Sequence, residues 1–278
     1  MADRLDRLNT FLCEVAASRD FDASFAALCS RFVAEGLPLW RVTVSYRTLD
    51  PTIRARTLVW WRDKGPTPDH FQTTHGEGEA QYLRSPIHHL LERDERAGRW
   101  RLRSDPVEEF PLLAELRAAG GTDYVMHLLR FDGGMPELPG VALAFATDRA
   151  DGFSEAELAE LARIAPALGV AAGRAMLVQI MTSVLGLYLG PRTARLVLDG
   201  RIRRGAGQRM EAAILVADLR GFTLLAASAD PQHLVGWLDE HLAVMIDAVS
   251  AQGGEVLKLL GDGLLAVFAV ERPGADAE

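Results

Sequence analysis

Two apolar segments near the end of the chain, each followed closely by an acid, constrain the fold more than any other feature. Residues 213–217 lead directly into Asp218, and residues 255–260 lead into the pair Gly261-Asp262. A continuous apolar run such as 213–217 predicts a strand buried on both faces. Gly-Asp is a two-residue hairpin signal, because glycine supplies the positive φ that such a turn needs. The sequence therefore predicts one acid at a strand end and a second at a hairpin tip.

The residues after Asp218 are typical of a turn into a helix. Backbone N–H groups at such a turn point outward and bind phosphate oxygens well. Mg²⁺ prefers one or two carboxylates together with substrate phosphate and water. We therefore predict a metal–nucleotide site in which Asp218 and Asp262 are the catalytic, metal-binding residues. The predicted substrate-binding residues are Lys258, Leu219, Gly221, Phe222 and Thr223.

Each of these charged residues also has a purely structural interpretation. Asp218 fits a helix N-cap acid, Asp262 fits ordinary turn chemistry, and Lys258 fits a strand residue whose ammonium group reaches water. Residues 231–252 form one amphipathic pattern that Gly253-Gly254 ends, so a helix is expected between the two strands. The metal-site interpretation depends on the strand–helix–hairpin order bringing both acids together.

The two motifs together resemble the start of the class III nucleotidyl cyclase catalytic domain. The first metal-binding aspartate of that family lies in a motif of the form F-x-D-I-x-G-F-T, which here is V-A-D-L-R-G-F-T around Asp218. The second lies in a Gly-Asp hairpin, which here is Gly261-Asp262. Lysine three residues before that glycine is typical of adenylate cyclases, whereas guanylate cyclases carry glutamate there. Lys258 therefore favours ATP as the substrate.

The resemblance implies an adenylate cyclase, a phosphorus–oxygen lyase that converts ATP to 3′,5′-cyclic AMP and pyrophosphate. Two Mg²⁺ or Mn²⁺ ions would bridge Asp218 and Asp262, and the family's head-to-tail pairing of catalytic domains implies a homodimer. The later half of the family domain, with its second base-reading residue and its asparagine–arginine pair, has no match here. We therefore expect this chain to be inactive by itself, either as a fragment of a longer cyclase or as a degraded relative.

The first 175 residues have the patterns of helices and antiparallel strands. From Trp40 to Tyr46, apolar residues alternate with polar ones, which predicts a half-buried strand. Pro66 and Pro68 are expected to break the strand pattern that follows. Further strands are expected at 54–61, 123–131 and 141–147, and helices at 5–15 and 21–32, with short ones near 87–91 and 112–116.

A closing helix is expected after a capping box formed by Ser154 and Glu157. Its seam has unusually small residues for a coiled coil, which predicts a partner helix in a dimer, packing on the protein's own sheet, or both on different faces. This order of elements, and above all the segment from Gly140 through ATDRADGFSEAELAELARIAPAL, resembles a GAF-like sensory domain. The resemblance implies a small-molecule or other signal that the fold alone does not identify. The seam consists of Leu158, Leu161, Ala165, Leu168, Ala172 and Ala175.

We therefore predict an α+β protein in three parts. A GAF-like antiparallel-sheet domain with flanking helices covers residues 1–175, a helical connector covers 176–210, and an incomplete ferredoxin-like cyclase domain covers 211–278. The predicted function is a sensor-regulated adenylate cyclase. The alternative is a non-catalytic sensory or dimerisation module with a degenerate cyclase remnant, and a third possibility is a membrane-associated regulator that uses the apolar helix.

Charge and composition exclude several classes of protein. A net charge of −8 argues against a nucleic-acid partner, and two unpatterned cysteines argue against a disulfide framework. The N-terminus lacks the apolar core of a signal peptide, and the most apolar span, 175–190, is short for a membrane helix. We expect a cytoplasmic protein without a membrane partner. Four histidines of the variable region fit solvated loop residues better than a metal or haem site: His70, His75, His88 and His89.

Overall fold

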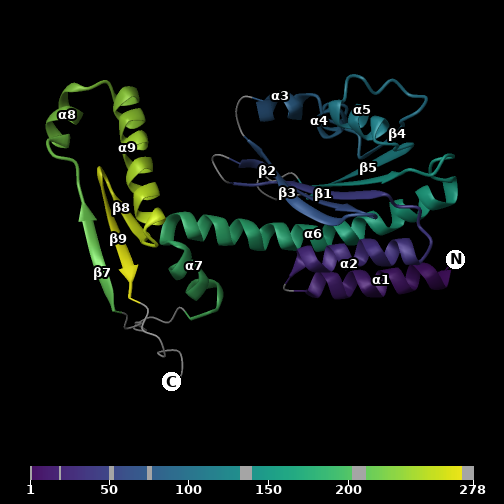
Figure 1. Cartoon of the computed structure of the whole chain (residues 1–278), viewed down its shortest axis with the longest axis horizontal. Coiled ribbons are helices and arrows are strands. Elements are labelled where there is room, and N and C mark those ends of the chain that lie inside the picture. Colours follow the sequence, from purple (N-terminus) through teal and green to yellow (C-terminus); the bar gives the residue numbers. More distant parts are fainter. Residues whose placement is uncertain are drawn as a thin grey trace. The chain divides into compact units, whose positions relative to one another are not determined.

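The computed structural model describes residues 2–18, 20–49, 53–73, 77–131, 140–201 and 211–270. The chain divides into two compact units, Met1–Ile180 and Met181–Glu278, which are described separately (Figure 1). Both units combine helices with an antiparallel sheet, so the predicted α+β class is confirmed. The boundaries at residues 175 and 210 stay predictions, and helix α6 (Glu155–Leu189) is continuous through the first of them.

The first unit is built on one six-stranded sheet with the strand order β3-β2-β1-β6-β5-β4, in which all neighbours are antiparallel. Helices α1 (Ala2–Ala17), α2 (Phe21–Ala34) and α6 lie on one side of the sheet (Figure 1). Helices α3 (Glu77–Leu83), α4 (Pro86–Glu92) and α5 (Pro111–Ala118) lie on the other. The strands are β1 (Arg41–Arg47), β2 (Ile53–Trp61), β3 (Gly65–Thr73), β4 (Ala97–Arg101), β5 (Asp123–Arg130) and β6 (Gly140–Thr147).

The central strand β1 is buried on both faces, so the prediction of a half-buried strand is wrong. Val42 on one face is 0% exposed, and Arg41 and Thr43 on the other are 8% and 5% exposed. The second helical layer covers the face that carries the polar residues. The guanidinium of Arg41 lies over the ring of Trp61, 5.2 Å from its centroid, and burial lowers the pKa of Arg41.

Strand β3 continues through Pro66 and Pro68, where the strand pattern was expected to break. β3 is an edge strand that pairs with β2 alone among the described residues. Proline is tolerated at an edge because its missing N–H can face outward, and the β2–β3 pairing has two register shifts. Helix α3 and strand β4 were not predicted, because both are short and Gly98 interrupts the alternation in β4.

The predicted capping box begins helix α6. The N–H of Ser154 donates to Oε2 of Glu157 at 2.8 Å, and the N–H of Glu157 donates to Oγ of Ser154 at 3.3 Å. Just before it, Phe153 donates its N–H to Oδ2 of Asp123 at 2.9 Å. Asp123 is 1% exposed and also accepts from Nη2 of Arg99 at 2.8 Å. This buried carboxylate therefore connects β4, β5 and the start of α6.

We expect Asp123→Asn to lower the free energy of unfolding by about 3 kcal/mol, because it removes the buried charge that Arg99 and the N–H of Phe153 share and leaves Arg99 with only the exposed Glu155 as a charged partner. Urea denaturation followed by circular dichroism measures the change. Glu108→Gln is the control, since it removes the exposed ion pair with Arg117 and should leave the midpoint unchanged. Equal midpoints for Asp123→Asn and the native chain would contradict the structural role of Asp123.

Four of the six seam residues on α6 are buried within the first unit, and Leu158 and Ala175 are half-buried. Leu161, Leu168 and Ala172 are 0% exposed, and Ala165 is 2% exposed. Most of the seam therefore packs within its own unit, which is the second of the predicted alternatives. Over Glu155–Gly186 the helix is long and apolar enough to cross a membrane, yet 50% of its most apolar window is buried. Core helices of soluble proteins meet the same criterion of length and composition.

The second unit contains a three-stranded antiparallel sheet with the order β7-β9-β8. Helix α9 packs on β8 and β9 through a small core in which Val249 meets Leu264 and Ala266. The predicted strand–helix–hairpin order is confirmed. The elements are α7 (Pro191–Leu198), β7 (Ala212–Ala217), α8 (Phe222–Ser228), α9 (Pro231–Ala251), β8 (Glu255–Leu260) and β9 (Gly263–Ala269).

Strand β7 is exposed, so the prediction that it is buried on both faces is wrong. Ile214 and Val216 are 70% and 66% exposed, and Leu215 is 39% exposed. The physical reason is that β7 pairs only with β9 in the described part of the chain, while α9 packs mainly on β8 and β9. An apolar strand with an open edge is a surface for association.

We expect Val216→Lys to reduce self-association of the 278-residue chain, because a charge on an exposed strand opposes edge-to-edge pairing. Light scattering over a series of protein concentrations measures this effect. Thr223→Lys places the same charge at an exposed position on α8 and should change the scattering less. Scattering from the Val216→Lys chain equal to that of the native chain would show that β7 is not the association surface.

Candidate functional site

The register of β7 and β9 brings the two predicted metal-binding acids together. Ala217 pairs with Leu264, so the next residues, Asp218 and Gly263, come opposite each other. A Cβ added to Gly263 would lie 2.4 Å from the carbonyl oxygen of Ala217 and 3.1 Å from Oδ1 of Asp218. Asp262 directly precedes Gly263. Both acids therefore lie at the same end of the sheet.

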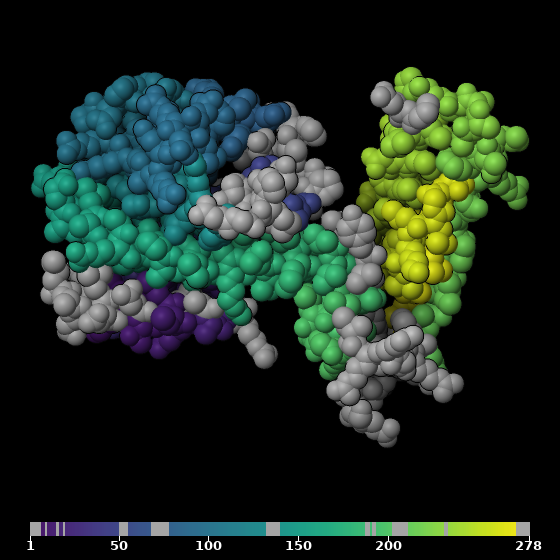
Figure 2. All heavy atoms as spheres, turned by 180° about the vertical axis from the view of Figure 1, so that it is seen from behind, coloured from purple at the N-terminus to yellow at the C-terminus, as the bar shows by residue number. Residues whose placement is uncertain are grey.

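Asp262 lies in the tight turn between β8 and β9, as predicted. Leu260 pairs with Gly263, which leaves the two-residue turn Gly261-Asp262. Gly261 has a φ of 71°, while Asp262 does not have a positive φ, which is the pattern of a type II′ turn. Atoms of β8 and β9, yellow in Figure 2, form part of the surface of the second unit. The turn thus fixes Asp262 beside Asp218 on an accessible hairpin.

The segment after Asp218 has the predicted turn, but Asp218 is not the helix N-cap. Gly221 is the N-cap, with a left-handed φ of 78°, and α8 begins at Phe222. Oδ1 of Asp218 instead accepts the N–H of Leu219 at 3.1 Å. Phe222 and Thr223 belong to the first helical turn, whose N–H groups have no acceptor within the helix. The N-cap interpretation of Asp218 is therefore wrong, and its carboxylate is exposed.

Lys258 lies on the same face of the sheet as Asp218. Lys258 pairs with Leu265, two residues beyond Gly263 on β9, and alternate residues of a strand share a face. Leu264, which lies between Gly263 and Leu265 on β9, points to the opposite face, into the core beneath α9. The open face therefore combines an acid and a lysine with exposed apolar side chains. These apolar side chains are Ile214, Val216 and Leu260.

The acids fit a metal that arrives with a phosphate ligand. No group of three or more His, Cys, Asp or Glu side chains that could hold a metal occurs in the described residues. Mg²⁺ needs only one or two carboxylates when substrate phosphate and water complete its coordination. His88 and His89 lie half-buried in helix α4 and pack edge-on against aromatic rings, so the prediction that they are solvated loop residues is wrong. The side chains of His70 and His75 are outside those described.

Comparison with known proteins gives short matches to adenylate cyclases, while no family model matches the chain. The chain is 39% identical to an adenylate cyclase of Mycobacterium tuberculosis over 66 residues. The matched segment is 24% of this chain and 15% of that relative. Over 67 residues the chain is 33% identical to an adenylate cyclase of Anabaena cylindrica, with 24% and 13% covered. The chain thus spans about 13% to 15% of the length of these relatives. The matches support a cyclase-related region.

Two similar solved structures are of GAF domains. One is the GAF domain of a two-component sensor histidine kinase from Bacillus halodurans, with a TM-score of 0.42 and 12% identity over 58% of this chain and 99% of that one. The other is the phycoerythrobilin-bound GAF domain of a cyanobacterial phytochrome, with a TM-score of 0.40 and 13% identity over 63% of this chain and 95% of that one.

We expect Gly263→Ala to destabilise the second unit by about 1–3 kcal/mol, because its methyl group would overlap the backbone of β7. Gly236→Ala is the matched control, since Gly236 lies inside α9 with open space where the Cβ would be. That change should stabilise the helix by about 0.5–1 kcal/mol. Thermal unfolding followed by circular dichroism measures both. The reverse order of the two midpoints would contradict the close approach of β7 and β9.

Proposed function

We propose that residues 211–278 are the metal- and nucleotide-binding part of a class III adenylate cyclase domain that a GAF-like domain regulates. The observation that carries the proposal is the juxtaposition of Asp218 and Asp262 by the β7–β9 register and the hairpin turn. The strand order β7-β9-β8 is the order expected for the first part of a ferredoxin-like domain. In such a domain a further strand covers the open edge of β7. The short matches to adenylate cyclases support the same family.

The proposed reaction is the cyclisation of ATP. The ribose 3′-oxygen bonds to the α-phosphorus, the bond from that phosphorus to pyrophosphate breaks, and the hydroxyl proton is released. Asp218 and Asp262 would hold the metal ions, and the backbone N–H groups of Phe222 and Thr223 would bind phosphate oxygens. Bound Mg²⁺ or Mn²⁺ would supply Lewis acidity, which makes the hydroxyl more acidic and neutralises charge on the leaving group.

Lys258 would select the adenine base. Its side chain is exposed on the same sheet face as Asp218. An ammonium group has three donors and no acceptor. It therefore suits the N1 acceptor of adenine better than guanine, which presents an N1–H donor at that place. ATP is the proposed substrate for this reason.

We also propose that the chain forms a homodimer through the open sheet face of the second unit. Exposed apolar side chains beside functional residues mark protein interfaces, and Ile214 and Val216 are such residues. The dimer would complete each site with groups from a second copy. The first unit would receive a small-molecule or other signal and act through the helical connector. A cytoplasmic location without membrane or nucleic-acid partners is part of the same proposal and agrees with the net charge of −8.

The second candidate function is a non-catalytic sensory or dimerisation module. The exposure of β7 on its edge and faces favours it, because an open apolar strand suits association. The two candidates differ in one property that this chain can show directly. A cyclase-derived site binds a metal–nucleotide complex through both acids, whereas a module of this kind has no need of that binding.

We expect the chain to bind Mn²⁺ with ATP, as measured by isothermal titration calorimetry. Asp218→Asn and Asp262→Asn should each weaken this binding by roughly tenfold or more, because each removes an anionic ligand. Asp247→Asn changes an acid on α9, outside the hairpin, and should bind as the native chain does. Undiminished binding by both site variants would favour the non-catalytic module.

A further inference from the structure

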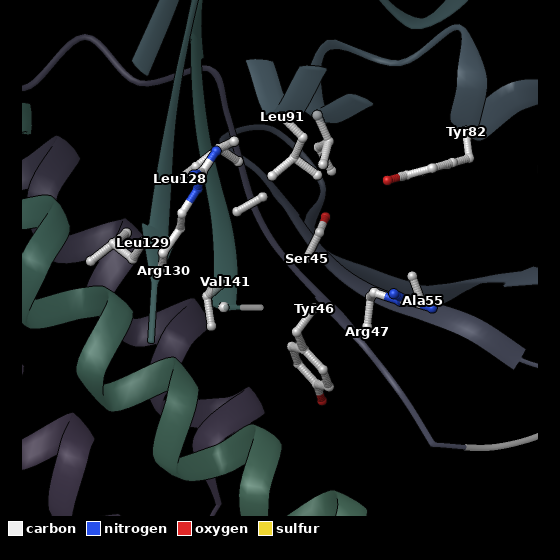
Figure 3. Close-up of a pocket in the computed structure, with 13 residues that line it drawn as sticks. Ser45, Tyr46, Arg47, Ala55, Tyr82, Leu91, Leu128, Leu129, Arg130 and Val141 are labelled. Carbon is white, nitrogen blue, oxygen red and sulfur yellow. The ribbon is translucent and has the colours of Figure 1, made fainter. Parts of the chain in front are cut away.

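The first unit contains a cavity of about 190 Å³ between its sheet and the helices α3 and α4 (Figure 3). Residues from β1, β2, β5 and β6 line one side, and Tyr82, Ile87 and Leu91 from the two helices line the other. An engineered protein cavity of about 150 Å³ holds benzene. The cavity therefore has room for a molecule that contains a small ring.

The lining is mostly apolar, and its polar side chains are two arginines together with Ser45, Tyr46 and Tyr82. The apolar residues include Leu91, Leu128 and Ala142. Arg130 comes from β5 and Arg47 from β1, and Figure 3 shows them on opposite sides of the cavity. None of the 13 described lining residues is acidic. The cavity thus combines a mostly apolar lining with two cationic side chains.

A glycine separates the two arginines. Arg130 pairs with Gly140 of β6, and Tyr46 pairs with the next residue, Val141. Arg47 therefore comes opposite Gly140 from the other side, and the two arginines lie two strand spacings apart, about 10 Å between backbones. Gly140 has a φ of 145°, and an added Cβ would overlap the carbonyl of Leu129. The position between the two arginines in the sheet thus has to remain without a side chain.

The hydrogen bonds of Arg130 are incomplete. Its Nη1 pairs with Asp94, whose side chain is 84% exposed at the rim. Its Nε is buried, and no described group accepts that proton. A buried donor without an acceptor is costly, and the cost is greater for a charged group. An anionic oxygen is the group that would satisfy this donor.

We propose that this cavity binds a small carboxylate with an apolar, ring-sized body, and that Arg130 and Arg47 hold the carboxylate. A planar guanidinium matches a carboxylate through parallel N–H···O bonds, while the leucines and alanines surround the apolar body. The inference rests on the sensor half of the proposed function, because it names the class of signal that the first unit receives. The inference does not depend on any role of Asp218 or Asp262.

Benzoate is the probe, and benzamide is its neutral counterpart of the same shape. Isothermal titration of the full 278-residue chain, without nucleotide, should show benzoate binding about tenfold or more tightly than benzamide. Arg130→Met and Arg47→Met should each lose about tenfold in benzoate affinity. Arg117→Met is the matched control, because Arg117 also pairs with an exposed acid, Glu108, but lies outside the cavity. It should bind benzoate as the native chain does.

A cavity-filling variant tests the site without changing its charge. Ala142→Leu keeps both arginines and occupies the space of the ligand, so it should abolish benzoate binding while the chain stays folded by circular dichroism. Equal affinity for benzoate and benzamide would overturn the proposal, as would native-like benzoate binding by folded Arg130→Met or Ala142→Leu chains. Failure of benzoate and of straight-chain carboxylates from butanoate to octanoate to bind would also overturn it. Because no nucleotide is present, these outcomes are independent of the cyclase proposal.

Discussion

The close approach of β7 and β9 at Gly263 is the constraint on which the candidate catalytic site depends. The pairing of Ala217 with Leu264 fixes the register, and the missing side chain at Gly263 lets the two backbones approach. A shift by one residue would turn Asp218 toward the core beneath α9 and separate it from the hairpin acid. The two-residue turn at Gly261-Asp262 then fixes the position of Asp262 at the end of the hairpin, which requires no long-range packing. Two local features and one register thus build the whole arrangement.

The acid pair could be predicted from the sequence because its determinants are local. A strand end, a glycine turn and a Gly-Asp hairpin each have a short sequence signature, and the structure has all three where the sequence predicts them. The burial of β7 could not be predicted in the same way. An apolar run indicates a strand that is able to be buried, but its exposure depends on which neighbours cover it. Here one partner strand and α9 leave Ile214 and Val216 open.

The first unit shows the same division between local and non-local information. The capping box at Ser154 was predictable, because its two hydrogen bonds join residues three apart. The burial of Arg41 was not, since the helices that cover it are distant in the sequence. The cavity arginines were also missed, because Arg47 looks like the polar half of an alternating strand. Gly140 is the residue that could have indicated the cavity arginines. Its position between Arg47 and Arg130 can be recognised only when the register of β1, β6 and β5 is known.

The two units share one continuous element, since α6 extends through the division at Ile180. Most of its seam is buried within the first unit, while Val170, Leu177 and Met181 of the same helix are exposed. The exposed face of β7 beside Asp218 is the surface that the second unit offers. Ligand binding and catalysis would then depend on different units that are joined through one helix. Such a division of roles agrees with the proposed sensor-regulated enzyme.

The most direct test of the central claim is cyclic AMP production by a hybrid enzyme. In the hybrid, residues 211–270 replace the equivalent segment of the Mycobacterium tuberculosis adenylate cyclase to which the chain is similar. The account predicts that the hybrid converts ATP to cyclic AMP, that Asp218→Ala or Asp262→Ala abolishes the activity, and that Asp247→Ala leaves it unchanged. A folded, dimeric hybrid without activity would contradict the account, as would full activity in either site variant.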